Sequence, residues 1–133
     1  MLKYILKLIV SFVTSLIGGI MFGIMGLIIG STIGGNFGFP AFGGNVGYES
    51  GGVFFAIVGI SLGSLLGVML ISKLRKQIYN LKKALIIIVF TIGISVSLFD
   101  YNMSTIIELL ILFLPPLSLT ALTRDNKPTP VIM

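Results

Sequence analysis

Residues 18–34 read GGIMFGIMGLIIGSTIG, and residues 51–67 read GGVFFAIVGISLGSLLG. In both segments small residues recur at steps of four, three, four and four positions, so each series lies on one narrow face of a helix. The two series are Gly19, Gly23, Gly26, Gly30 and Gly34, and then Gly52, Ala56, Gly59, Gly63 and Gly67. Small residues let the backbones of apolar helices approach closely. We expect these faces to pack on each other, or on copies in other subunits, in the pattern called a glycine zipper.

The composition indicates a membrane protein. Of the 133 residues, 56% are hydrophobic and only 10% are charged, whereas soluble domains average about 25% charged residues. The chain therefore has too few charged residues to cover a water-soluble fold. We expect an all-α integral membrane protein that forms a single membrane domain.

Four apolar runs predict four transmembrane helices, over residues 8–33, 53–72, 84–99 and 106–122. About 20 helical residues cross the hydrocarbon core of a bilayer. The first run is too long for the apolar region of a signal peptide, which has roughly 7–15 residues. The third run is short, and Pro115 and Pro116 predict a kink or a break in the fourth.

These runs divide the chain into two hairpins. Residues 1–72 form the glycine-rich hairpin, residues 73–83 a basic cytoplasmic loop, residues 84–123 the second hairpin, and residues 124–133 a cytoplasmic tail. Eight glycines and Pro40 predict an external loop over residues 34–52. In the basic loop, Leu74, Ile78 and Leu81 have the spacing of a short amphipathic helix on the membrane surface.

The distribution of charge predicts the orientation. With four spans, all nine Lys and Arg residues lie on one side of the membrane. The loops on the other side hold only two charged residues, Glu49 and Asp100. The positive-inside rule then places both termini in the cytoplasm of a multi-pass cell-membrane protein. The basic residues of the central loop, which we expect at the membrane surface, are Lys73, Arg75, Lys76, Lys82 and Lys83. We interpret them as an orientation signal and expect no nucleic-acid partner.

The two glycine-rich segments align without a gap at an offset of 33 residues. Consecutive spans cross the membrane in opposite directions, so a true duplication would be an inverted repeat, an arrangement that often builds transporters. The alternative is that similar glycine and isoleucine content produces the likeness without duplication.

Two carboxylates are candidates for an ion or proton site. Glu108 lies just inside the fourth span, where a charge is costly and often functional. However, Thr105 and Glu108 also match a capping box, in which the glutamate caps the helix start. Glu49 is either a solvated loop acid or one wall of an ion entry. The chain has no histidine and no cysteine, and no nucleotide-binding motif, so we expect no metal, no cofactor and no enzymatic activity.

Three functions fit these features. The first is an accessory or structural subunit that docks with other membrane helices through close glycine-mediated packing. The second is an oligomeric transporter or channel for ions or small solutes, built on the inverted repeat. The third is a holin-like or immunity-type membrane protein. The expected partners are the lipid bilayer and other membrane helices, in a hetero-complex or a homo-oligomer.

Overall fold

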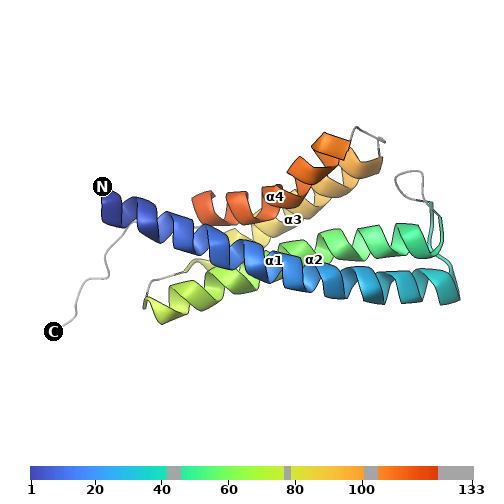
Figure 1. The fold of residues 1–133 in the computed structure, drawn as a ribbon, viewed down its shortest axis with the longest axis horizontal. Coiled ribbons are helices and arrows are strands. Elements are labelled where there is room, and N and C mark those ends of the chain that lie inside the picture. The colour runs from blue at the N-terminus through green and yellow to red at the C-terminus, as the bar shows by residue number, and fades with distance from the viewer. Residues whose placement is uncertain (42–45, 77–78, 101–104, 123–133) are drawn as a thin grey trace.

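The computed structural model describes residues 1–41, 46–76, 79–100 and 105–122. These residues form four α-helices and no strand: α1 (Leu2–Phe37), α2 (Tyr48–Leu74), α3 (Leu81–Asp100) and α4 (Thr105–Leu122). Figure 1 shows α1 and α2 side by side as one hairpin, with α3 and α4 forming a second hairpin against it. The fold is therefore all-helical within the described residues, as the composition predicts.

Within the part of the chain that is described, three helices are long and apolar enough to cross a membrane: α1, α2 and α3. Their outward faces carry large apolar side chains such as Ile24, Leu66 and Phe90, which are exposed in the isolated chain. In water this much exposed apolar surface would be strongly unfavourable, whereas lipid tails solvate it. The helices thus indicate a protein embedded in a membrane.

The connection within the first hairpin is shorter than the predicted loop over residues 34–52. α1 continues to Phe37, and α2 already begins at Tyr48. Both predicted bounds of the loop were wrong, because the prediction rested on the low helix propensity that glycine has in water. In lipid an unpaired backbone group costs several kcal/mol, so a helix persists through glycines that serve a close contact. Glycines with positive φ border the connection: Gly38 (75°) follows the last residue of α1, and Gly47 (62°) precedes the first residue of α2.

The basic segment does not form the predicted amphipathic helix. Leu74 is the last residue of α2 and Leu81 the first of α3, so they belong to different helices, and Ile78 lies outside the described residues. α2 ends in a turn at Arg75, after which Lys76 has a positive φ of 51°. At the start of α3, the side chain of Asn80 accepts a hydrogen bond of 3.2 Å from the backbone N–H of Lys83, as an N-terminal cap does.

The second hairpin packs on the C-terminal half of α2. Leu65, Val68, Ala84, Ile88 and Leu119 form the buried apolar cluster at this meeting point. The helix α4 continues through Pro115 and Pro116, both fully buried. Neither proline can donate a backbone hydrogen bond, so regular bonding is interrupted there without ending the helix. Two hydroxyls donate to the proline carbonyls in the following turn: Ser118 to Pro115 at 3.1 Å and Thr120 to Pro116 at 2.6 Å.

Candidate helix-packing site

The backbones of α1 and α2 lie in direct contact along most of the first hairpin. A Cβ atom added to Gly26 would lie 2.8 Å from the carbonyl carbon of Phe55, and one added to Gly59 would lie 2.8 Å from that of Phe22. Real Cβ atoms essentially never approach other atoms so closely. The glycines of this interface are therefore required by space, because any larger residue would push the helices apart.

The contacts keep a constant antiparallel register. Each step of four residues forward along α1 is matched by a step of four residues back along α2. The opposed pairs, in order along α1, are Thr14 with Gly67, Gly18 with Gly63, Phe22 with Gly59, Gly26 with Phe55, Gly30 with Gly51, and Gly34 with Gly47. One register thus extends over more than five helical turns of α1.

Contacts related by the sequence offset of 33 residues occur in pairs. A Cβ on Gly19 would lie 2.7 Å from the Ser64 hydroxyl oxygen, and a Cβ on Gly52 would lie 2.5 Å from the Ser31 hydroxyl oxygen. Gly52 corresponds to Gly19 at this offset, and Ser64 corresponds to Ser31. The contact of Phe22 with Gly59 corresponds in the same way to that of Phe55 with Gly26. The similar segments therefore meet through equivalent residues.

All ten residues singled out by sequence lie on α1 or α2, but they do not contribute equally. Gly26, Gly30, Gly34, Gly59, Gly63 and Gly67 face the backbone of the opposite helix, whereas Gly19, Gly23 and Gly52 first meet side chains. Ala56 also lies at the interface, since a Cβ added to Gly26 would lie 3.3 Å from its Cα. Sequence reasoning missed Gly18 and Gly51, which face backbone carbonyls. The doubled glycines at the start of each segment were the available signal.

Hydroxyl groups are buried beside the glycines. Ser15 on α1 donates a hydrogen bond of 3.0 Å to the carbonyl oxygen of Ser64 on α2. Both serines are fully buried. The hydroxyl of Ser64 itself has no hydrogen-bond partner within the described residues. The serine at position 15 was not predicted, because serine inside a span is common and only the three-dimensional register shows what it faces.

The two predicted carboxylate residues lie near the starts of α2 and α4. Glu49 is exposed in the first turn of α2, where its carboxylate accepts a hydrogen bond of 3.0 Å from the Tyr48 hydroxyl. Glu108 lies in the first turn of α4, and its side chain is outside the described residues. In the part of the chain that is described, no charged side chain is buried and no three acids could hold a metal ion.

The predicted basic residues flank the junction of α2 and α3. Lys73 lies in the last turn of α2, Arg75 and Lys76 follow it, and Lys82 and Lys83 lie in the first turn of α3. All four lysines are exposed, and Arg75 is partly buried. They share one end of the molecule with the N-terminus of α1 (Figure 1).

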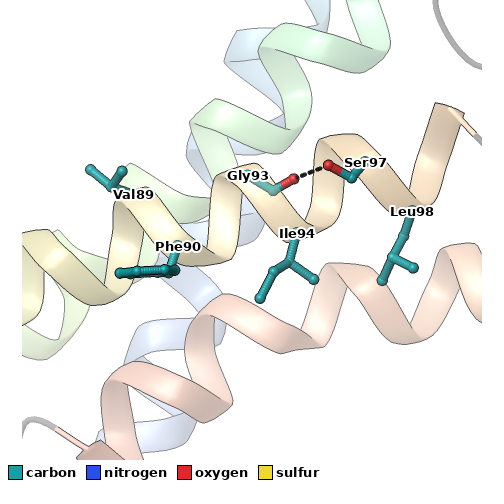
Figure 2. Close-up of a pocket in the computed structure, with 6 residues that line it drawn as sticks. All are labelled: Val89, Phe90, Gly93, Ile94, Ser97 and Leu98. Carbon is teal, nitrogen blue, oxygen red and sulfur yellow. Dashed lines mark hydrogen bonds between the residues drawn. The ribbon is translucent and has the colours of Figure 1, made fainter.

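A shallow apolar groove runs along α3. Its lining residues are Val89, Phe90, Gly93, Ile94, Ser97 and Leu98 (Figure 2). Ser97 bonds to the Gly93 carbonyl at 2.8 Å within the helix. Nothing in the described residues comes within 4 Å of a Cβ placed on Gly93, so this glycine lies open where the hairpin glycines are enclosed.

Comparison of the chain with protein-family models, with curated proteins and with solved structures finds no match. The function is therefore argued from the geometry of the molecule.

Proposed function

We propose that this chain is a small multi-pass subunit of the cell membrane, with an accessory or structural role in a larger membrane assembly. In this proposal all four helices span the bilayer and both termini face the cytoplasm. The nine Lys and Arg residues, gathered on one side by four spans, support that orientation.

The observation that carries the proposal is the backbone contact between α1 and α2. Gly26 and Gly59 each face a backbone carbonyl across the interface, which supports the proposal that the first hairpin is a closely packed unit of the glycine-zipper type. Helices in lipid gain no hydrophobic free energy from pairing, so this close contact supplies the dispersion energy that holds them. A closely packed hairpin whose described residues include no buried charge suits a supporting role better than a transport pathway, which usually contains ionisable groups.

The proposal also predicts which surface of the chain binds a partner. The glycine faces are occupied within the chain, so a partner helix binds to an outward face. We expect a stoichiometric larger complex when the tagged protein is purified in a mild detergent and cross-linked. Recovery of the chain alone, as a monomer, would contradict an accessory role.

The second candidate is an oligomeric transporter or channel protomer. The observation in its favour is the set of equivalent contacts at the offset of 33 residues, which supports an inverted repeat. A homo-oligomer without other proteins in the same purification, together with ion or solute flux in proteoliposomes, would favour this function over the first.

A further inference from the structure

One end of the molecule carries a defined contact between α1 and the end of α2. The guanidinium group of Arg75 donates hydrogen bonds of 3.0 Å to the carbonyl oxygen of Lys7 and 3.2 Å to the hydroxyl oxygen of Ser11. The Ser11 hydroxyl also donates to the Lys7 carbonyl at 2.9 Å. Both bonds from Arg75 use the same nitrogen, Nη1. The guanidinium is thus fixed on α1 by one nitrogen, and within the described residues its other N–H groups have no hydrogen bond that would keep them from a ligand.

This contact places Arg75 on the face of α1 that carries Lys3 and Lys7. Lys3, Lys7 and Ser11 follow each other at steps of four residues, so they lie on one face of α1, with neighbouring positions about 5–6 Å apart. The guanidinium group of Arg75 contacts that face at Ser11. Among the described residues no carboxylate forms a salt bridge here, and Glu49 lies at the start of α2, at the far end of the hairpin.

Neighbouring like charges repel each other, and an anion bound between them removes that repulsion. A phosphate group has the geometry that an arginine fork and nearby ammonium groups bind best. We propose that Lys3, Lys7 and Arg75 form a binding site for the phosphate of an anionic phospholipid, at the membrane surface where Arg75, at the end of α2, contacts the first turns of α1.

The surroundings favour a lipid over a free anion. Leu6 on α1 and Leu74 on α2 are 62% and 71% exposed, and each is next in sequence to a basic residue. A phospholipid places its acyl chains along such apolar surface while its headgroup meets the cations. A free phosphate ion would gain only the polar contacts. The site does not depend on whether the protein serves as a subunit or a transporter.

The test is a titration of the detergent-solubilised full chain with phosphatidylglycerol, followed by native mass spectrometry. The double variant Lys3→Gln/Lys7→Gln removes two charges whose side chains make no interaction in the described structure, so folding should be preserved. Its matched control, Lys82→Gln/Lys83→Gln, removes two charges from the same end but from α3. We expect the first variant to bind phosphatidylglycerol about tenfold more weakly, and the control to bind nearly as the parent chain does.

Four outcomes would overturn the proposal. Equal losses in the two double variants would mean a diffuse basic surface rather than a site. Equal binding of phosphatidylcholine would mean that the negative charge is not recognised. Displacement of the lipid by millimolar inorganic phosphate would mean that a free anion is the ligand. Full lipid affinity in an Arg75→Gln variant would mean that the guanidinium group does not bind the phosphate.

Discussion

The hydroxyl of Ser15 in α1 reaches across to the backbone of α2 and donates a 3.0 Å hydrogen bond to the carbonyl oxygen of Ser64. A helix carbonyl is normally shielded from other helices by side chains. Here the neighbouring pair Gly18 and Gly63 has no side chain to keep the backbones apart. Close packing and the interhelical hydrogen bond therefore depend on each other at this point.

Replacing Ser15 by alanine should weaken the pairing of α1 and α2. The variant loses the hydrogen bond, and interhelical hydrogen bonds in membrane proteins contribute roughly 0.5–1.5 kcal/mol. We expect a lower thermal unfolding temperature in detergent. Ser97→Ala is the matched control, since Ser97 bonds only within its own helix and is exposed. If both variants unfold at the same temperature, the Ser15 bond adds no interhelical stability.

Replacing Gly59 or Gly26 by alanine should lower the stability of the protein far more than the small size of a methyl group suggests. Each added methyl group would meet a backbone carbonyl of the opposite helix, and backbone cannot move aside without separating the helices. Overpacking of this kind costs roughly 1–3 kcal/mol or more. The two variants occupy equivalent positions of the two similar segments, so we expect similar losses of stability in thermal or denaturant unfolding.

Gly93→Ala provides the control for these two variants. Nothing described lies within 4 Å of its added Cβ, and alanine is about 1 kcal/mol more favourable than glycine inside a helix. Its expected effect on unfolding is therefore neutral or stabilising. A loss at Gly93 as large as that at Gly59 would show that helix propensity or lipid contact, rather than the α1–α2 interface, explains the glycines.

The helical class and the approximate place of each helix could be predicted from sequence, because long apolar runs have few structural alternatives. The bounds of the first loop could not. Gly34 and Gly51 have low helix propensity in isolation, and only their contacts with Gly47 and Gly30 explain why they lie in helices. Likewise, spacing alone suggested a series through Gly52, whereas the structure places Gly51 against the opposite backbone. The rotation of a helix about its axis depends on its partner.

Replacing Glu108 by glutamine separates its two predicted roles. A glutamine at this position can still cap the first turn of α4, so we expect the thermal stability of the variant to remain near that of the parent chain. It cannot carry a proton or neutralise a cation. If the protein supports flux in proteoliposomes, loss of that flux in a stable Glu108→Gln variant would assign Glu108 to the pathway. A large loss of stability would instead mean that the carboxylate charge itself supports the helix.

The orientation can be measured directly because the chain has no cysteine. Single cysteines introduced at Glu49 and at Lys82 give two reporters at opposite ends of the hairpins, and both native side chains are exposed. With an impermeant maleimide on intact cells, we expect labelling of the Glu49→Cys variant, since the positive-inside rule places that end outside. The Lys82→Cys variant should react only after the membrane is permeabilised. The reverse pattern would invert the topology, and labelling of both variants in intact cells would contradict a fixed orientation with α2 across the membrane.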